Sequence, residues 1–537
     1  MNELPSTLVV DIPEIIYMIV GYLDEPTLRK TALVCKAWSQ HSIRLLWNQL
    51  IIPKDWYSHD LSPLWPGLDR NGHLLKALCL QLSPATRMAQ DIDLAQIVNQ
   101  LTNLLSRTPN LERLQIQVPR KIKSTLLSTV AIHAKNLKQF DTDLLEWNSA
   151  DVTVLLKGCP ALTQIAGHNF TGNILQAIAQ TSPQQLCKID CTRPLFDDDE
   201  LVEFASQFPD LVQLSVSVHP FLTAMALMGV AQYCHKLEHI NFRFCLGLQA
   251  NGFQALLGAS PNLRVLDLGL TEVLDADIAL VAGQCPQLET LKLPFCSHIT
   301  EASIRGIVSS CARLLHLDVS FCDKILLSIF DADIAWACER LDHLDISGIH
   351  GSYAVDVTRA CMLLPAMYRQ LGRLTVLRYL KMAGHGFSLQ MLDVGKSELS
   401  KLKKLETLDI SKLRKPLPWK DLVEIGDLFP RLTEFQFRSS DVIPPELDEE
   451  EKEEGGDEST TKDVPEAEKT LEDAALEPAK EKEPPSQALL TEDIPMAEVM
   501  KATLFSGLEI SFRLNGEDEE GEVGAEEGFG FPGGVPF

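Results

Sequence analysis

A leucine-based pattern repeats along most of the chain at nearly constant spacing. In the stretch 288–314, Leu291 and Leu293 alternate as in a short strand with one buried face, and Ile304 and Ile307 then recur at helical spacing. The nine steps between successive anchor leucines in residues 111–341 measure 26, 25, 24, 25, 26, 26, 25, 26 and 27 residues. The fourteen anchors are Leu75, Leu111, Leu137, Leu162, Leu186, Leu211, Leu237, Leu263, Leu288, Leu314, Leu341, Leu377, Leu405 and Leu432.

A strand followed by a helix, repeated every 24–27 residues, is typical of leucine-rich repeats. One such unit cannot bury its apolar face alone, so the units must stack and pair each strand with its neighbours. The sequence therefore predicts an α/β fold, a leucine-rich-repeat solenoid of about 14 strand–helix units over residues 75–440. Strands should line its concave face and helices its convex face.

Alternate strand positions point away from the buried leucines and should form an exposed binding surface. They mix charged, amide and aromatic groups, as protein-recognition surfaces do. Phe244, Phe295 and Phe321 share the eighth position of their units. For any one polar side chain, simple solvation explains the pattern equally well. We predict that the protein substrate contacts His239, Asn241, Arg243, Lys292, His316, Asp318, His343, Asp345, Tyr379 and Lys381.

Four of these residues could form a metal site. His316 and Asp318 occupy the same unit positions as His343 and Asp345, one strand further on. Imidazole and carboxylate groups can bind a divalent cation, but such a quartet is more often a hydrogen-bonded polar ladder. We therefore predict no metal and no cofactor. No phosphate-binding loop and no nucleophile–base signature is recognisable, so no catalytic residue is assigned.

Eight of the thirteen cysteines follow the repeat. Five stand three residues before an anchor leucine and three stand eight residues after one, and no C-x-x-C pair occurs. Small apolar side chains at tight positions of each unit explain this placement better than zinc or disulfide chemistry does. They are Cys159, Cys234, Cys285, Cys311 and Cys338, then Cys245, Cys296 and Cys322.

Residues 8–47 do not follow the repeat. Asp11 suits the N-cap of a first helix with Pro13 in its first turn, and the isoleucines after it lie on one face. Asp24 and Pro26 suit the start of a second helix. Residues 33–38 are predicted to lie on a third helix.

The segments Ile-Pro-Glu-Ile, Leu-Asp-Glu-Pro-Thr-Leu and Leu-Val-Cys-Lys-Ala-Trp in residues 8–47 resemble an F-box. The first position is Ile12, where that family usually has leucine. An F-box followed by repeats with Cys-Pro-x-Leu ends resembles the F-box/leucine-rich-repeat family. The resemblance implies that a Skp adaptor subunit docks on a surface formed or supported by Ile12, Pro13, Ile16, Leu28, Leu33, Val34, Cys35 and Trp38.

The resemblance further implies a substrate-recognition adaptor of a cullin–RING ubiquitin ligase, non-catalytic in itself. Through the Skp adaptor it would join cullin and RING subunits, while the repeats bind the protein to be ubiquitinated. The alternative is a scaffold or regulator that uses the solenoid without a ligase, with N-terminal helices that serve as a cap or bind the Skp adaptor. Residues 48–74, with Trp56 and Trp65, are predicted to connect the F-box rigidly to the first repeat.

The C-terminal part changes composition sharply. Residues 441–490 carry 18 acidic and 5 basic residues, which predicts a disordered acidic linker over 441–488. Residues 489–514 regain apolar residues and suit one further strand. Residues 515–537 hold 7 acidic residues and no basic one, followed by a Gly- and Phe-rich end. We hypothesise that the phenylalanines of this tail dock on the concave face and compete with the substrate.

The net charge of −26 argues against general binding to nucleic acid or to anionic membranes. No apolar run is long enough to span a bilayer, and the first residues lack a basic signal-peptide region. The sequence therefore favours a protein of the cytoplasm, the nucleus or both.

Overall fold

The computed structural model describes residues 13–23, 25–52, 55–58, 60–87, 93–120, 122, 126–181, 185–330, 336–349, 357–384, 395–411, 417–418, 425–438, 442–443 and 509–513. Most of the predicted acidic linker at 441–488 and all of the tail at 515–537 lie outside these residues, as does Ile12. The described chain belongs to two compact units that divide between β11 and β12, and each is described separately below.

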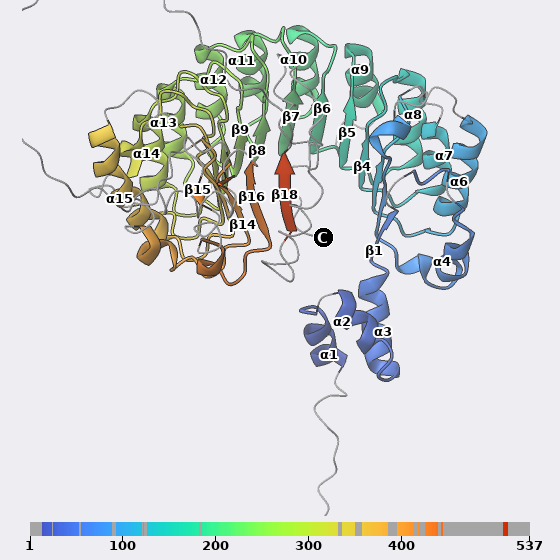
Figure 1. Ribbon diagram of the computed structural model, residues 1–537. Helices are drawn as coiled ribbons and strands as arrows, with labels where there is room; N and C mark the ends of the chain where they lie inside the picture. Colours follow the sequence, from blue (N-terminus) through green and yellow to red (C-terminus); the bar gives the residue numbers. More distant parts are fainter. Residues whose placement is uncertain are drawn as a thin grey trace, which may run out of the picture. The chain divides into compact units, whose positions relative to one another are not determined.

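The first unit contains a continuous parallel sheet of eleven strands, each paired with the next along the chain. Helices follow the strands and line the outer side of the curved sheet, so the strands form the inner, concave face (Figure 1). The strands are β1 (Gln49–Ile52), β2 (Ala77–Leu80), β3 (Arg113–Ile116), β4 (Gln139–Thr142), β5 (Gln164–His168), β6 (Lys188–Thr192), β7 (Gln213–Ser217), β8 (His239–Asn241), β9 (Val265–Asp267), β10 (Thr290–Lys292) and β11 (His316–Asp318).

The helices of this unit include three N-terminal helices and one helix in nearly every repeat. They are α1 (Pro13–Val20), α2 (Glu25–Thr31), α3 (Lys36–Leu46), α4 (Trp65–Asn71), α5 (Pro84–Arg87), α6 (Leu94–Ser106), α7 (Leu126–His133), α8 (Ser149–Gly158), α9 (Gly172–Thr181), α10 (Asp198–Gln207), α11 (Ala224–Tyr233), α12 (Ala250–Gly258), α13 (Asp275–Gln284) and α14 (Glu301–Ser310). Three 3₁₀ helices are η2 (Ser62–Leu64), η3 (Gly72–Leu74) and η4 (Leu327–Phe330).

The second unit continues the same strand pattern with fewer described helices. Its parallel sheet has the order β12 (His343–Asp345), β13 (Tyr379–Lys381), β14 (Thr407–Asp409), β16 (Glu434–Arg438) and β18 (Glu509–Arg513). A small separate pair joins β15 (Leu417–Pro418) to β17 (Val442–Ile443). The long helix α15 (Val357–Arg373) fills the enlarged repeat that precedes β13.

The anchor leucines explain this architecture. Each of the fourteen is followed, two residues later, by the first residue of a strand, and all but Leu432 are buried. Leu291 on β10, for example, is fully buried and stands in register with Leu266 on β9 and Leu317 on β11. Stacking these side chains from strand to strand builds a continuous core in each unit, so the predicted leucine-rich-repeat solenoid is confirmed. Strand β1 adds to the fourteen predicted ones, and β18 lies within residues 489–514, where one further strand is predicted.

Local signals place the helix starts. The Thr300 side chain accepts a hydrogen bond from the backbone N–H of Ala302 and caps α14. At α10, Asp197 and Glu200 form a reciprocal capping box, with both hydrogen bonds at 2.9 Å. The acidic run at 197–200 therefore begins a helix, where its charges suit the positive end of the helix dipole.

Two sequence predictions need correction. The sheet begins at β1, inside the predicted connector 48–74, so that segment supplies the first strand as well as a link. Residues 33–38 were expected on one helix, but α2 ends at Thr31 and α3 begins at Lys36. Residues 32–35 form the turn between these two helices, and Cys35 has an extended backbone at the N-cap of α3.

Among the described residues, no helix has both the length and the apolar character needed to cross a membrane.

Candidate functional site

The three N-terminal helices share a small core of their own. Ile16 and Val20 of α1 are fully buried, and Leu28 of α2 is nearly so. Half-buried apolar side chains of α3, Trp38 among them, pack against these three residues. The Thr31 hydroxyl lies 2.8 Å from the Ser42 hydroxyl and links α2 to α3. This core is small for a unit of about forty residues, so its stability depends on further packing.

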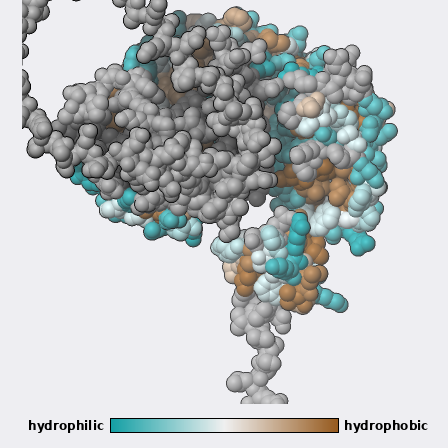
Figure 2. Space-filling model, in the orientation of Figure 1, coloured by the Kyte–Doolittle hydropathy of each residue, from teal (hydrophilic) through white to brown (hydrophobic). Residues whose placement is uncertain are grey.

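The same helices expose an unusual number of large apolar side chains. Figure 2 shows hydrophobic residues at the surface of this lower body, which Figure 1 identifies as α1–α3. Leu33 is 87% exposed and Val34 is 67% exposed, both in the turn that precedes α3. Tyr17, Met18 and Ile19 of α1 and Tyr22 in the turn after it are exposed as well, and these four residues with Leu33 and Val34 are here called the exposed apolar cluster.

The structure separates the residues predicted to serve the Skp adaptor into two groups. Ile16 and Leu28 lie in the core, and Trp38 packs against it, so they can only support a docking surface. Leu33, Val34 and Cys35 are exposed in one turn and can contact a partner directly. Pro13 begins α1, but its side chain and all of Ile12 lie outside the described residues. Ile19 was expected on the buried stripe but is 41% exposed.

A short, well-packed connection joins these helices to the repeats. Only Trp47 and Asn48 separate α3 from β1, and the Asn48 carbonyl accepts hydrogen bonds from the backbone N–H groups of Lys76 and Ala77. Further along, Trp56 is fully buried, and its indole N–H donates to the Gln117 carbonyl at 2.9 Å. The end of α3 is thus bound directly to the first strands of the sheet.

The concave strand face carries rows of side chains in register. One row runs Gln213, His239, Val265, Thr290 and His316, and a second runs Ser215, Asn241, Asp267, Lys292 and Asp318. These side chains are half-buried, except for those of Ser215 and Asp267, which are buried. All of them are polar except Val265. Lys292 of β10 stands between Asp267 and Asp318, so the second row alternates in charge along these three strands.

The predicted substrate-contact residues of the first unit lie on this face. His239, Asn241, Lys292, His316 and Asp318 are strand residues of β8, β10 and β11, and Arg243 follows β8. In the second unit, His343 and Asp345 lie on β12, and Tyr379 and Lys381 lie on β13. Here the His343 ring stacks on Tyr379 with centroids 4.0 Å apart.

The possible metal quartet is divided between the units, with His316 and Asp318 in the first and His343 and Asp345 in the second. His343 Nδ1 lies 3.0 Å from the Asp342 carboxylate, which gives this imidazole an acidic neighbour of its own. In the part of the chain that the structure describes, no group of three or more His, Cys, Asp or Glu side chains is arranged to hold a metal ion.

A half-buried group of carboxylates on and next to β4 and β6 was missed by the sequence analysis. Burial, with the charges of Asp190 and Asp143 as further causes, raises the pKa of Asp141 to about 7. Burial also raises the pKa values of Asp143 and Asp190 to about 6. His168 on β5 has its pKa lowered to about 4 by burial and then by nearby arginines. These residues occupy the fifth and seventh positions of their repeats. Asn241 was selected because such alternate positions point away from the buried leucines, and the same pattern could have identified these residues.

The edge where the strands begin carries ladders of ion pairs. Glu112 accepts hydrogen bonds from Lys76 and Lys138, each at 2.7 Å, and these bonds lower its pKa to about 2. Arg264 similarly lies between Glu238 and Glu289. These groups are largely exposed, so they set the register of neighbouring repeats more than they stabilise them.

The cysteines that follow the repeat are buried thiols. Each of Cys159, Cys234 and Cys285 donates to a backbone carbonyl of the preceding repeat. Burial raises the pKa of Cys285 to about 11 and that of Cys234 to about 12. All twelve described cysteines are free thiols, in agreement with the structural interpretation of their spacing.

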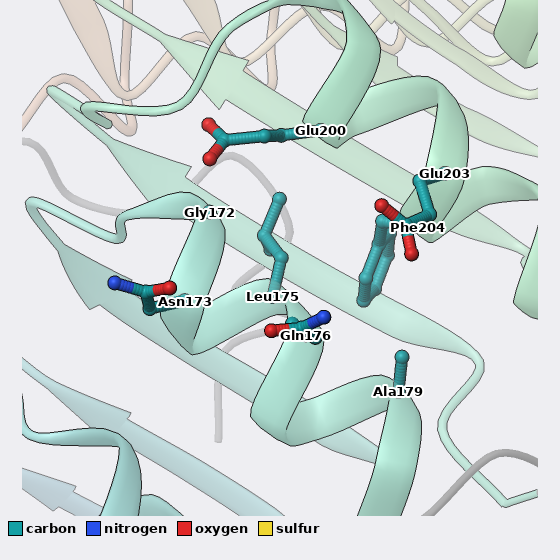
Figure 3. A pocket seen from close by; sticks show the side chains of 8 residues that line it. All are labelled: Gly172, Asn173, Leu175, Gln176, Ala179, Glu200, Glu203 and Phe204. Atoms are coloured by element: carbon teal, nitrogen blue, oxygen red, sulfur yellow. The ribbon is translucent and has the colours of Figure 1, made fainter.

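A cavity of about 100 Å³ lies between α9 and α10 (Figure 3). The Glu200 carboxylate at its rim is held by the backbone N–H of Asp197 in the capping box, so it stabilises the start of α10. The close approach of Glu200 to Gly172 leaves little room for a ligand. The lining residues are Gly172, Asn173, Leu175, Gln176, Ala179, Glu200, Glu203 and Phe204.

Two of the relatives that the chain matches are F-box proteins by name. The chain aligns with F-box/LRR-repeat protein 4 of Bos taurus at 26% identity over 143 residues, which is 22% of this chain and 23% of that protein. It aligns with F-box protein SKIP1 of Arabidopsis thaliana at 22% identity over 215 residues, covering 40% of this chain and 68% of that protein. The chain is related to F-box/leucine-rich-repeat proteins. No protein-family model matches it.

A third relative is a putative RNA-binding protein, EEED8.10, of Caenorhabditis elegans, 23% identical over 329 residues. That alignment covers 55% of this chain and 43% of that protein, so the chain matches less than half of the length of two of these three relatives. Among solved structures, yeast Rad7 in complex with Elc1 aligns over 83% of this chain at 15% identity and a TM-score of 0.42. A Leptospira interrogans leucine-rich-repeat protein aligns over 80% at 14% identity and a TM-score of 0.33.

Proposed function

We propose that this chain is a non-catalytic substrate adaptor of a cullin–RING ubiquitin ligase. Its N-terminal helices bind a Skp-type adaptor, and its concave strand face binds the protein to be ubiquitinated. The observation that carries the proposal is the exposed apolar cluster on helices that already have their own core. Apolar side chains such as Leu33 and Val34, left at the surface of a small helical unit, favour a protein partner that covers them.

The connection to the repeats supports the same role. With two residues between α3 and β1, and with the Asn48 carbonyl bonded to β2, a partner on the helices is held at a defined distance from the first repeats. An adaptor needs this property, since the bound substrate must face the site of ubiquitin transfer. The proposed role is carried out in the cytoplasm or the nucleus.

The rival proposal is a scaffold whose N-terminal helices act without a ligase. Purified chain is mixed with a Skp-type adaptor, a cullin and a RING subunit, and the species that co-elute are identified. The ligase proposal expects all four proteins in one complex. Binding of the adaptor without the cullin would favour the scaffold, and failure to bind the adaptor would overturn both adaptor-based proposals.

Replacing both Leu33 and Val34 with glutamate should weaken adaptor binding by roughly 30-fold or more, because two central apolar contacts are lost and charges take their place. The measurement is titration calorimetry with a purified Skp-type adaptor. Both side chains are exposed, so the thermal unfolding midpoint should stay the same. Ile132→Glu is the matched control: Ile132 is 62% exposed on α7, and its variant should bind the adaptor normally.

Cys35 provides a second test without any change of the apolar cluster. It is exposed directly after Val34, whereas Cys285 and Cys234 are buried and have raised pKa values. We expect a maleimide to modify Cys35 quickly in the free chain and about tenfold more slowly in the adaptor complex. Peptide mass spectrometry reads each site separately. Equal modification of Cys35 with and without adaptor would place the contact elsewhere.

A further inference from the structure

The turns that follow the strands of the first unit hold a column of residues in a backbone conformation that favours glycine. Asn169, Arg193, Val218, Phe244, Leu270, Phe295 and Phe321 all have φ between 52° and 61° and stand at the eighth position of successive repeats. In the second unit the same position is glycine, at Gly348 and Gly384. A non-glycine side chain with positive φ is uncommon, and for bulky or β-branched residues it is a strained conformation.

Backbone hydrogen bonds hold the column in place. From Asn169 to Phe295, the N–H group of each member donates to the carbonyl that precedes the next member, as from Phe244 to Gly269, from Leu270 to Pro294 and from Phe295 to Ser320, each at 2.8 Å. These bonds need no particular side chain, and glycine would satisfy them with less strain. The side chains at these positions therefore need a reason other than the fold.

Five consecutive members are apolar: Val218, Phe244, Leu270, Phe295 and Phe321, here called the apolar ladder. None is buried, and Phe295 is 48% exposed and Phe321 36% exposed. The Phe295 and Phe321 rings stack with centroids 4.7 Å apart and planes within 12° of each other. Since strained positions cluster where proteins bind ligands, a row of exposed apolar side chains at such positions indicates a contact surface.

Directly before the apolar ladder, on its strand side, the charges have one sign, whereas Glu272 and Asp323 stand two residues after Leu270 and Phe321. In the repeats from β6 to β11, the ladder position and the position before it carry two charged residues, Arg193 and Arg243, and no acidic residue. A segment that combines phenylalanines with acidic residues therefore fits this surface. Residues 515–537 of the same chain have that composition, with 7 acidic residues up to Glu527 and then Phe529, Phe531 and Phe537 among glycines and prolines.

The tail is long enough to cover several positions of the apolar ladder. Two phenylalanines separated by one residue stand about 7 Å apart in an extended segment, while four ladder positions span roughly 14 Å at the usual strand spacing. The fourteen residues from 514 to 527 can extend up to about 50 Å beyond β18. We propose that residues 528–537 of this chain bind the apolar ladder, with the acidic residues before them facing Arg193 and Arg243. The proposal rests on the proposed function only in that this surface adjoins the substrate-contact face.

The test uses a chain that lacks residues 515–537 and a fluorescent peptide of those residues. The truncated chain should bind the peptide, more weakly as salt increases, and the intact chain should bind it less well because its own tail competes. Replacing Phe295 and Phe321 with asparagine, which tolerates positive φ, in the truncated chain should weaken binding roughly tenfold or more. Phe221→Asn is the matched control, because Phe221 is 83% exposed but lies outside the ladder, and it should leave binding unchanged.

A peptide with asparagine at 529 and 531 should also bind roughly tenfold or more weakly. This arm needs no change in the folded chain. Peptide binding that is unaffected by both pairs of substitutions would overturn the proposal. Concentration-dependent dimerisation of the truncated chain that is lost in the ladder variant, without peptide binding, would assign the surface to a second copy instead. None of these measurements involves the Skp adaptor, so this proposal and the ligase proposal can fail independently.

Discussion

Leu291→Ala is expected to lower the free energy of unfolding by about 3–5 kcal/mol, the usual cost of removing a fully buried leucine and leaving a cavity. Leu291 lies between Leu266 and Leu317, so its loss removes packing from two neighbouring repeats at once. Because each repeat of a solenoid contacts only its neighbours, hydrogen exchange should rise first around β9–β11. Urea unfolding followed by circular dichroism gives the stability change.

Leu246→Ala is the matched control for this experiment. Leu246 is 51% exposed in the turn after β8, so its variant should change the stability by less than about 0.5 kcal/mol. Equal effects of the two substitutions would contradict the assignment of the strand leucines to one continuous core. A loss below about 1 kcal/mol for Leu291→Ala would contradict it as well.

Asp141→Asn is expected to stabilise the protein at pH 8 by about 1–2 kcal/mol. Burial raises the pKa of Asp141 to about 7, so at pH 8 the folded chain must keep a charged carboxylate in a poorly solvated place beside Asp190 and Asp143. Raising the pKa of Asp141 from 3.8 to about 7 corresponds to a loss of roughly 4 kcal/mol in the free energy of unfolding at pH 8. Contact of the side chain with solvent reduces this loss. Asparagine keeps the shape and removes the charge.

The sign of the pH dependence follows from linkage. A carboxyl group with a raised folded pKa binds more protons in the folded than in the unfolded state, so the wild-type stability rises as the pH falls from about 7 toward 4. The gain from Asp141→Asn should therefore vanish near pH 4. Thermal unfolding midpoints between pH 4 and pH 8 measure both curves. Asp210→Asn, at an exposed site, should show no such trend, and destabilisation by Asp141→Asn at every pH would contradict the prediction.

The candidate sites could be predicted in part. The repeat register correctly placed His239, Asn241 and Lys292 on one strand face, because alternation along a strand decides which side chains leave the core. It could not show that Asp141 and Asp190 have raised pKa values, since burial depends on what the neighbouring repeats cover. The motif that resembles an F-box identified the N-terminal segment but did not separate the buried Ile16 from the exposed Leu33.

The sequence by itself determined the solenoid, because leucines at a period of 24–27 residues can be buried only by stacking the units in register. It also determined the helix starts at Thr300 and Asp197, where the capping groups lie within three residues of their partners. Only the tertiary structure decided which apolar side chains stay exposed. The turn at residues 32–35 and the positive-φ column depend on how neighbouring helices pack and on hydrogen bonds between neighbouring repeats, and no local pattern encodes either of these.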